Sequence, residues 1–194
     1  MSLEQLVPAA VAEGAHVKWH PVRTPRGRAE QSAAGRAAAA AALAEAGSTD
    51  LVVPREPDGR PRFPQGFAGA IAHTDSVAVA VVVPGAEAVG VDIEDAVISP
   101  RVARFVLRDR ERAALLRPDG AYSARDLFSA KEAAFKALCS LGGGGGLGGP
   151  DQFLFWRIEL DQVDGTLVAS HRGVAVPVWV RSEPRRSLAV AIRR

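Results

Sequence analysis

The chain has 194 residues, of which 47% are hydrophobic and 24% are charged, and its formal net charge is only +2. This composition is ordinary for a globular protein that can bury a sizeable core. Such a small net charge excludes the strongly basic footprint of a nucleic-acid-binding domain, although a pI of about 9.1 allows a modestly basic face. We therefore expect no nucleic-acid partner.

The first half of the sequence predicts one long helix and a set of strands. Residues 28–46 are rich in alanine, which has the highest helix propensity, and Gly47 follows as a C-cap. Prolines and glycines punctuate residues 54–66, which predicts a surface loop. Strands are predicted at residues 17–19, 70–72, 77–83 and 89–94, the last three as neighbours.

Two helices are predicted next. Ser99 and Pro100 form an N-cap and first-turn pair for a helix that we expect to reach Arg117. Ser123 and Asp126 resemble a capping box that opens a second helix. The side chains expected to face inward from the first helix include Val102, Phe105, Val106 and Leu116.

The end of the chain predicts a strand meander after a loop. Residues 142–149 contain seven glycines and predict a flexible loop. Asp164-Gly165 is a hairpin signal. Strands are predicted at residues 153–160, 166–170, 174–180 and 187–192. The order of helix, strands, helices and strands predicts an α+β fold with mainly antiparallel sheet in each half.

The chain has a single cysteine, Cys139, so no disulfide can form within it. We expect Cys139 to be a small buried residue on a helix. The first ten residues carry Glu4 and no basic stretch, which is unlike a signal peptide. No apolar run approaches the roughly 18 residues that a membrane span needs. These observations predict a cytoplasmic protein without stable membrane association.

Two short motifs carry the candidate chemistry. Side chains alternate along the strand-like GVDIE, so Asp92 and Glu94 project from one face about 7 Å apart. Along the helix-like FSAKEAAFK, Glu132 and Lys136 lie one turn apart and share a face. If the segments meet, three carboxylates converge beside a lysine, a cluster that suits Mg²⁺ together with substrate phosphates. The residues therefore indicate metal-assisted chemistry on a phosphate ester.

Each candidate also has a purely structural interpretation. Asp92 and Glu94 alone are ordinary on a solvated strand edge. Glu132 and Lys136 alone could form a surface salt bridge worth under ~0.5 kcal/mol. A histidine beside a turn, as at His73, is usually a polar surface residue. With 21 arginines in the chain, any one of them is a surface residue by default.

These motifs resemble those of 4′-phosphopantetheinyl transferases of the Sfp/EntD type, which carry G-[VI]-D-x-E and [WF]-S-x-K-E-[AS]-x-x-K. The similarity continues upstream in family order. Residues 57–61 resemble the family's G-[KR]-P turn, and residues 69–74 resemble its [IV]-S-H-[ST] segment, with Ala72 where relatives usually carry serine. Residues 28–36 are similar to an R-x-E…A-G-R helix of the EntD branch.

The resemblance implies a pseudo-twofold pair of α+β lobes with the active site at their interface. We expect the N-terminal lobe over residues 1–95 and the C-terminal lobe over residues 96–194. Because both lobes belong to one chain, we also expect a monomer.

The resemblance further implies transfer of the 4′-phosphopantetheine arm of coenzyme A (CoA) to a serine of an apo acyl or peptidyl carrier protein. The reaction releases 3′,5′-ADP and uses Mg²⁺. We expect a role in secondary-metabolite or siderophore synthesis, with nonribosomal peptide, polyketide and fatty-acid pathways all open. A non-catalytic CoA- or nucleotide-binding module and a metal-dependent phosphohydrolase are the alternatives. Intact carboxylates argue against the first, and four scattered histidines argue against the second.

The family pattern also implies roles for individual residues. Asp92 and Glu132 are implied metal ligands, with Glu94 as the third. Glu132, or a metal-bound water beside it, takes the serine proton, while Lys136 and His73 stabilise the pyrophosphate. The implied CoA-binding residues are Arg28, Arg55, Gly59, Arg60, Ala72, His73 and Lys136.

Overall fold

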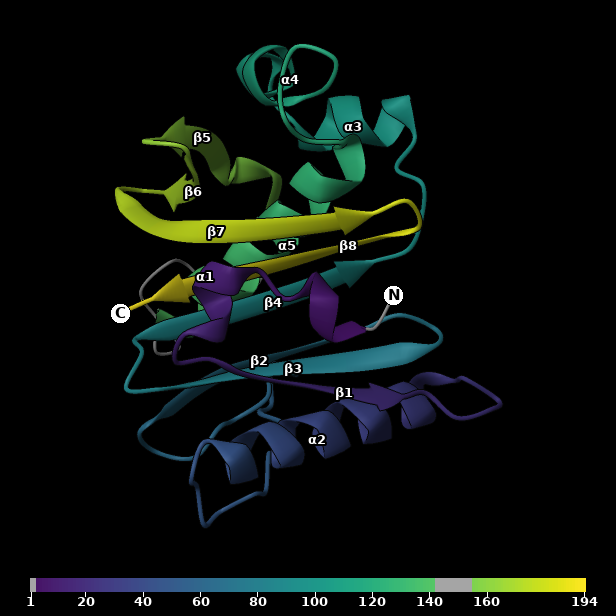
Figure 1. Ribbon diagram of the computed structural model, residues 1–194, viewed down its shortest axis with the longest axis vertical. Helices are drawn as coiled ribbons and strands as arrows, with labels where there is room; N and C mark the ends of the chain where they lie inside the picture. The colour runs from purple at the N-terminus through teal and green to yellow at the C-terminus, as the bar shows by residue number, and fades with distance from the viewer. Residues whose placement is uncertain (1–2, 142–154) are drawn as a thin grey trace.

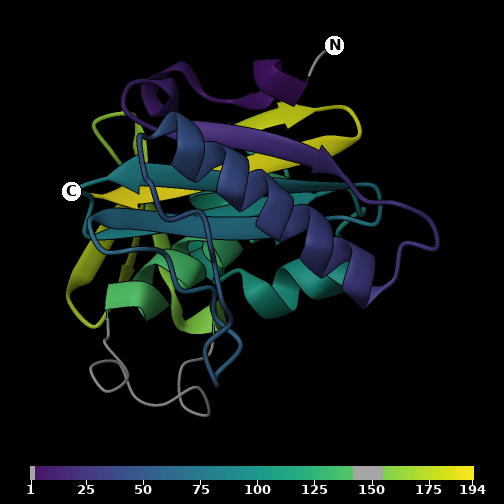
Figure 2. The ribbon, with the colours of Figure 1, turned by 90° about the horizontal axis from the view of Figure 1, so that it is seen from below.

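The computed structural model describes residues 3–141 and 155–194, and it contains two antiparallel sheets that pack against each other (Figure 1). The first sheet has the order β1-β3-β2. Figure 2 shows a long helix, α2, lying across this sheet. The elements of this half are η1 (Leu3–Leu6), α1 (Ala9–Ala12), β1 (His16–Pro21), α2 (Arg28–Glu45), β2 (Phe67–His73) and β3 (Val77–Pro84).

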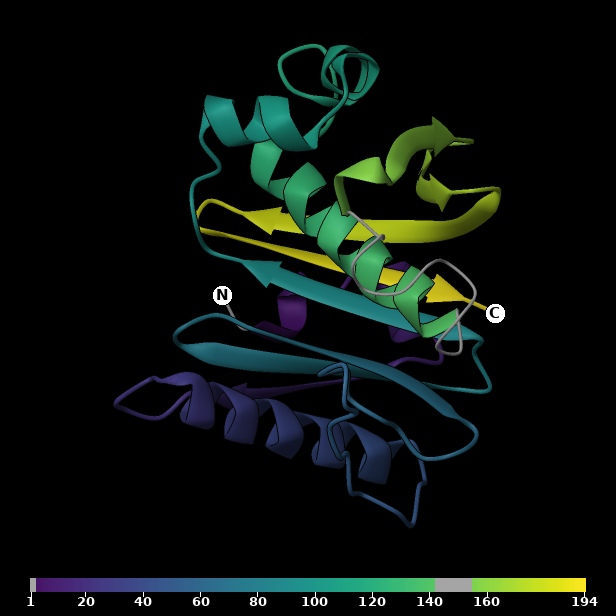
Figure 3. The same ribbon diagram turned by 180° about the vertical axis from the view of Figure 1, so that it is seen from behind.

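The second sheet has the order β4-β8-β7-β6-β5, and its strands also pair antiparallel. A second long helix, α5, crosses its outer face (Figure 3). The elements are β4 (Ala88–Glu94), α3 (Pro100–Val106), α4 (Asp109–Leu115), α5 (Ala124–Leu141), η2 (Phe155–Arg157), β5 (Glu159–Val163), β6 (Thr166–His171), β7 (Val174–Glu183) and β8 (Arg186–Arg193). The α+β fold with antiparallel sheets is thus confirmed.

An apolar core joins the two sheets. The odd-numbered side chains of β4 are Val89, Val91 and Ile93, and they pack in this core with alternate valines of β3 and with β8. Side chains alternate along a strand, so the even-numbered positions of β4 face the other way, toward α5. The candidate residues Asp92 and Glu94 are both even-numbered and lie on that face.

The predicted strands of the N-terminal half are present, but β4 belongs to the other sheet. Its partner is β8, with Asp92 opposite Ala189 and Glu94 opposite Ser187. β4 lies beside β2 without pairing with it. The expected third strand is therefore present and lies beside β2, but it pairs in the other sheet. The division into lobes at residue 95 stays a prediction, and this pairing groups β4 with the C-terminal sheet.

The N-terminal helix agrees closely with the sequence. α2 ends at Glu45, and Gly47 follows with a positive φ of 85°, which suits glycine. Its alanines pack tightly on β3 and are fully buried at Ala38, Ala39 and Ala42. The alanine-rich composition therefore serves close helix–sheet packing.

The single helix predicted from Pro100 to Arg117 is instead two short helices, α3 and α4. Ser99 caps α3 by accepting a hydrogen bond from the Val102 amide at 3.3 Å, as predicted. Val106 is buried, but Val102 and Phe105 are exposed, so their predicted inward orientation is wrong. The chain is extended at Leu107, where its ψ of 133° ends α3.

The start of α5 is the predicted capping box. The Ser123 amide donates to Asp126 Oδ2 at 2.7 Å, and the Asp126 amide donates to Ser123 Oγ at 3.2 Å. The hydroxyls of Ser182 and Ser187 also donate to the Asp126 carboxylate. Burial raises the pKa of Asp126, but these hydrogen bonds outweigh it and hold the pKa below its usual value.

The C-terminal meander is present. Asp164 and Gly165 both have positive φ, as a two-residue type I′ hairpin turn requires. The predicted loop at residues 142–149 and the start of the predicted strand at residues 153–154 lie outside the described residues. Residues 155–157 form η2 rather than strand.

Cys139 lies on α5 and is half-buried, and burial raises the pKa of its thiol to about 11. It is therefore protonated and weakly nucleophilic at neutral pH. None of the helices in the described parts of the chain combines the length and apolarity needed to cross a membrane.

Candidate active site

Gly90 lets the two motifs meet. A Cβ atom at this position would lie 1.8 Å from the carbonyl oxygen of Ala133 and 2.8 Å from the amide nitrogen of Ala137. Only glycine allows the backbones of β4 and α5 to approach so closely. The helix runs antiparallel to the strand (Figure 3), and this contact places the polar face of α5 over Asp92.

Both carboxylate oxygens of Asp92 are held by α5. The ammonium of Lys136 donates to Oδ1 at 3.0 Å, and the hydroxyl of Ser129 donates to Oδ2 at 3.0 Å. Lys136 also donates to the carbonyl of Val91 at 2.8 Å. Within the described residues the ion pair of Lys136 is thus with Asp92, so the alternative interpretation of Glu132 and Lys136 as a surface salt bridge is wrong.

Glu132 is a carboxylate in unfavourable surroundings. Burial raises the pKa of Glu132, and the negative charges of Asp92 and Glu94 raise it further, while Lys136 opposes them. Glu132 forms neither a hydrogen bond nor an ion pair with any residue that the structure describes. Its ionised form would be stabilised by an added cation.

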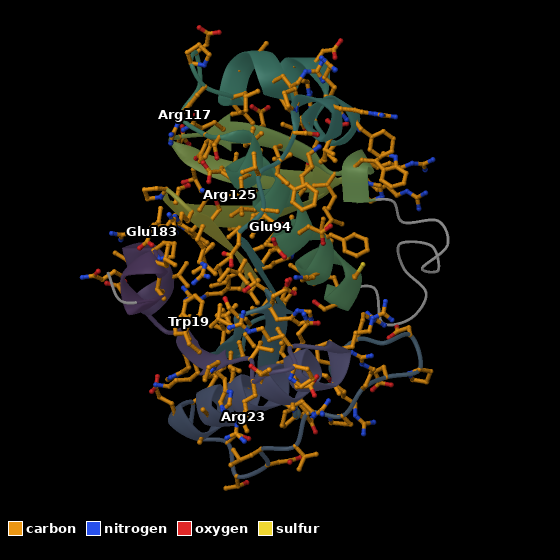
Figure 4. The ribbon with its side chains drawn as sticks, turned by 90° about the vertical axis from the view of Figure 1, so that its right-hand side faces the viewer. Trp19, Arg23, Glu94, Arg117, Arg125 and Glu183 are labelled. Atoms are coloured by element: carbon orange, nitrogen blue, oxygen red, sulfur yellow. The ribbon has the colours of Figure 1, made fainter. Side chains whose placement is uncertain are left out.

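Glu94 lies at the end of β4, between the part of the molecule with α2 and the part with α5 (Figure 4). Its Oε1 accepts a hydrogen bond from the Ala96 amide at 2.7 Å. The neighbouring Asp95 forms a two-bond ion pair with Arg186, at 2.5 Å and 2.9 Å. This pair fixes the chain just beyond the candidate ligands.

The carboxylates of Asp92, Glu94 and Glu132 are ligands of the kind that Mg²⁺ binds, but they do not form a ready-made metal site. Within residues 3–141 and 155–194, no three Asp, Glu, His or Cys side chains form a ready metal cluster. The Asp92 carboxylate instead contacts Lys136, and that of Glu94 accepts from the Ala96 amide. Mg²⁺ usually takes only one or two carboxylates and completes its shell with water and substrate phosphates. Glu132, which has no partner among the described residues and feels the charges of Asp92 and Glu94, fits that chemistry.

His73 brings the N-terminal sheet to the site. It is the last residue of β2 and is exposed to solvent. Partial burial of its ring lowers its pKa, and the positive charge of Lys136 lowers the pKa further. Asp75 and Asp92 oppose this effect. The histidine therefore lies within electrostatic reach of Lys136 and Asp92, and it is neutral at physiological pH. Its neighbour Ala72 is buried in the core between the sheets.

The remaining predicted CoA residues lie on the N-terminal half. Arg28 begins α2 and is exposed, and Arg55 is exposed beside Pro61; neither has an ion pair in the described parts of the chain. Arg60 bonds to Asp58 at 2.7 Å and to the carbonyl of Cys139 at 2.5 Å. It therefore anchors the loop to α5. Gly59 has a positive φ of 88° in the loop's turn.

Sequence reasoning missed Ser129, although this residue belongs to the motif. It is fully buried, and its hydroxyl donates the hydrogen bond that orients Asp92. The available signal was its spacing from Lys136, since residues seven apart share a helix face. A buried hydroxyl group needs a hydrogen-bond partner, and the carboxylate of an acidic residue on the neighbouring strand can accept its hydrogen bond.

Lys131 takes no part in this cluster. It is fully buried, and its ammonium bonds to Glu111 Oε2 at 2.7 Å and to the carbonyls of Val106 and Ile158 at 3.0 Å and 2.8 Å. These contacts use all three of its donors. Sequence reasoning also missed Glu111, the partner of this motif lysine.

We expect Gly90→Val to disrupt the site. The added side chain must push α5 away from β4, so both stability and the alignment of Asp92 with Ser129 and Lys136 should be lost. Overpacking of this kind costs about 1–3 kcal/mol or more of unfolding free energy. Thermal unfolding should show a lower Tm, and the activity expected of this site should fall even well below that temperature. Gly27→Val is the comparison variant for space, since Gly27 has an ordinary φ of −80° and its Cβ would meet only the flexible Glu30 side chain, at 3.0 Å. Equal Tm losses in the two variants would contradict the special role of Gly90.

Residues 23–83 match the family described as the 4′-phosphopantetheinyl transferase N-terminal domain. Residues 88–192, more than half of the chain, match the 4′-phosphopantetheinyl transferase superfamily. The chain belongs to the 4′-phosphopantetheinyl transferase superfamily. The second match contains both acidic motifs of this transferase, and the first contains His73 and the loop with Arg60. Comparison with curated proteins gives no match.

Membership confirms the resemblance at the level of the superfamily, and the antiparallel α+β architecture agrees with it. Phosphopantetheine transfer is the general activity of these domains. The transferase therefore acts on a phosphate-linked group, as the carboxylate and lysine motifs indicated.

Proposed function

We propose that this transferase moves the 4′-phosphopantetheine arm of CoA to a serine of an apo acyl or peptidyl carrier protein and releases 3′,5′-ADP. The observation that supports the proposal is the close contact between the backbones of β4 and α5 at Gly90. It places Asp92 between Ser129 and Lys136, with Glu132 close enough to feel its charge.

Asp92 and Glu132, with Glu94 as the third ligand, would hold Mg²⁺, which neutralises charge on the pyrophosphate when bound. Support comes from the raised pKa of Glu132, caused by burial and then by Asp92 and Glu94. A raised pKa also makes Glu132 a stronger base for the serine proton. Ser129 would keep Asp92 oriented throughout.

Lys136 and His73 would stabilise the pyrophosphate. Two donors of the Lys136 ammonium already hold Val91 and Asp92, which leaves the third for a phosphate oxygen. The proximity of His73 to Lys136 supports a shared phosphate contact from both halves of the molecule.

Arg28 and Arg55 would bind the nucleotide phosphates, because both guanidinium groups are exposed and unpaired in the described residues. Arg60 would act mainly by fixing the loop that carries Gly59, since its donors already contact Asp58 and Cys139. Ala72 would contribute through its backbone because its side chain is buried.

We assign the transferase to the Sfp/EntD type, acting as a cytoplasmic monomer in secondary-metabolite or siderophore synthesis. Both acidic motifs and both helix-covered sheets belong to one chain, which supports a site complete in a single molecule.

The test is incubation with CoA, Mg²⁺ and a panel of apo carrier proteins, followed by intact-mass analysis. We expect one carrier to gain the phosphopantetheine mass while 3′,5′-ADP appears in equal amount. Chelation of Mg²⁺ should stop the reaction, and a carrier with alanine at the acceptor position should gain nothing. Release of 3′,5′-ADP without carrier modification would instead indicate a phosphohydrolase. CoA binding without either product would indicate a non-catalytic module.

A further inference from the structure

A cavity of about 470 Å³ on the C-terminal half of the molecule is lined mostly by basic side chains. Its walls come from the start of α4, from η2 with the first residue of β5, and from the turn between β6 and β7. The volume lies within the range of about 300–1,000 Å³ that is usual for small-molecule sites. We call it the arginine cavity, and its charged and polar lining consists of Arg108, Arg157, Glu159, Ser170, His171 and Arg172.

The lining carries positive charge that the protein does not neutralise. Three arginines face one glutamate, which leaves a net charge of +2 when His171 is neutral. The carboxylate of Glu159 is already shared, because it pairs with Arg110 outside the cavity as well as with Arg108. Arg157 is exposed and forms no ion pair in the described parts of the chain. A cavity with this excess of positive charge attracts anions.

Hydrogen bonds fix the walls of the cavity before any ligand binds. The guanidinium of Arg108 donates to Glu159, and it also donates to the carbonyl of Arg157 at 3.2 Å. His171 is only 9% exposed, and a hydrogen bond with the Arg157 backbone links it to η2. Arg172 follows in a tight two-residue turn, where its φ is 49°. Three segments of the chain are thus held together around the cavity.

The electrostatic surroundings of His171 show that the arginines converge. Burial lowers the pKa of His171, and the charges of Arg172, Arg157 and Arg108 lower it further, against the backbone hydrogen bond that raises it. All three guanidinium groups are therefore close enough to act on one imidazole ring. The ring also provides a local reporter for any anion that enters the cavity.

The arginine cavity is far from the candidate active site. Asp92 lies opposite Ala189 of β8, which in turn lies opposite Val180 of β7. His171 lies opposite Val174, at the start of β7. Val174 and Val180 are therefore separated by about 20 Å of extended strand. Figure 1 shows the same arrangement, with β7 starting at the left and the tip of β4 at the right.

We propose that the arginine cavity binds a small molecule that carries a phosphate monoester, at a site separate from the candidate active site. A phosphate monoester carries close to two negative charges at neutral pH and has three strong acceptor oxygens. It therefore matches the net charge of the lining. The planar guanidinium groups of Arg157 and Arg172 suit two-bond contacts with phosphate, and the hydroxyl of Ser170 donates to a further oxygen.

The same charge balance makes the cavity selective. A carboxylate or a phosphate diester has one negative charge, so it leaves one of the two positive charges without a partner. A phosphate group also fills only part of the volume, and the rest of the cavity holds the organic part of the ligand. The inference does not depend on the proposed function, since it uses none of the residues assigned to CoA or Mg²⁺.

NMR spectroscopy of the histidine rings, with methyl phosphate and dimethyl phosphate as probes, tests this site. The chain has four histidines, and the signals of His171 are assigned by their loss in His171→Gln. At pH 8 methyl phosphate carries two negative charges, because the second pKa of a monoester is about 6, whereas the diester carries one. We expect methyl phosphate to shift the His171 signals with a Kd of about 1 mM or below in low salt. Dimethyl phosphate should bind at least about tenfold more weakly.

Variants of the lining locate the bound phosphate. Arg157→Gln and Arg172→Gln should each raise the Kd for methyl phosphate about tenfold or more, because each removes a charge-assisted contact. The matched control is Arg181→Gln, since Arg181 is exposed on β7 and does not line the cavity. Lys136→Ala should also leave the His171 response unchanged, whereas phosphate bound at the candidate active site would shift the His73 signals instead.

Each other outcome would overturn the proposal. Unshifted His171 signals would show that the cavity binds no phosphate. Equal affinity for the diester would show that the cavity attracts anions without selecting a monoester. An equal loss in Arg181→Gln would assign the effect to the overall charge of the surface. Loss of the His171 response in Lys136→Ala would assign it to the candidate active site. None of these results bears on phosphopantetheine transfer, so the proposed function stands or fails on its own test.

Discussion

Glu132→Gln and Asp92→Asn should each lower the kcat/KM for transfer by about 100-fold or more, since general base catalysis alone contributes 10²–10⁴-fold. Each substitution keeps the shape of the side chain and removes one negative charge from the group that would hold Mg²⁺. Asp92→Asn also weakens the contact with Lys136, which holds Oδ1 at 3.0 Å. Transfer rates measured by intact mass across an Mg²⁺ series would show the loss.

A Tm measurement can show that the lower kcat/KM of Glu132→Gln is not caused by unfolding. The pKa of Glu132 is raised in the folded protein by burial, then by Asp92 and Glu94, so the folded state disfavours its ionised form. Its contribution to stability is therefore full below the unfolded pKa and is lost as pH rises through the folded pKa. In chelator at pH 8, Glu132→Gln should unfold at a higher Tm than the wild type.

That gain should shrink as pH falls and should vanish below the ordinary glutamate value of 4.5, because the wild-type carboxyl is then protonated in both the folded and the unfolded state. The exposed Glu13→Gln is the matched control and should alter neither Tm nor transfer. Transfer within about tenfold of wild type in either site variant would contradict the assignment, because such a change is under 1.4 kcal/mol of transition-state stabilisation.

The local geometry of the site could be predicted because it depends on short periods in the sequence. Because side chains alternate along a strand, Asp92 and Glu94 were expected on one face of β4. Because residues four apart share a helix face, Glu132 and Lys136 were expected on one face of α5. The structure adds the physical link between the two, which is the missing Cβ of Gly90. A glycine inside a strand pattern signals close approach of another backbone, but the sequence alone does not say of which one.

Partner choice could not be predicted. Lys136 pairs with Asp92, 44 residues away, rather than with Glu132 on its own helix. β4 likewise pairs with β8 from the end of the chain instead of joining the preceding hairpin. Both choices depend on long-range packing, which a local pattern does not encode.

The break between α3 and α4 has a similar cause. The residues after Leu107 are good helix formers, so local propensity favours one helix. The break lets Glu111 turn inward, where it accepts hydrogen bonds from the amides of Arg108 and Leu160 at 2.8 Å and 2.7 Å. It also meets Lys131 there, so a buried ion pair overrides the helical pattern and leaves Phe105 exposed.

Lys131→Met should cause a large loss of stability. Both partners of the Lys131–Glu111 pair have fully buried side chains, and removal of one partner leaves the other charge buried and alone. Such a change costs about 3–5 kcal/mol of unfolding free energy. Chemical denaturation measures this loss directly. Arg110→Met is the matched control, because its ion pair with Glu159 is exposed and should contribute less than about 1 kcal/mol.

The double variant Lys131→Met/Glu111→Gln distinguishes a structural role of Lys131 from a role on substrate. Glu111→Gln removes the stranded charge and keeps an acceptor oxygen for the Leu160 amide, so much of the lost stability should return. If Lys131 only supports the fold, the double variant should also recover transfer, since Glu132 and Lys136 are untouched. Recovered stability with transfer still abolished would show that the Lys131 ammonium acts on substrate, in contradiction to its three buried contacts.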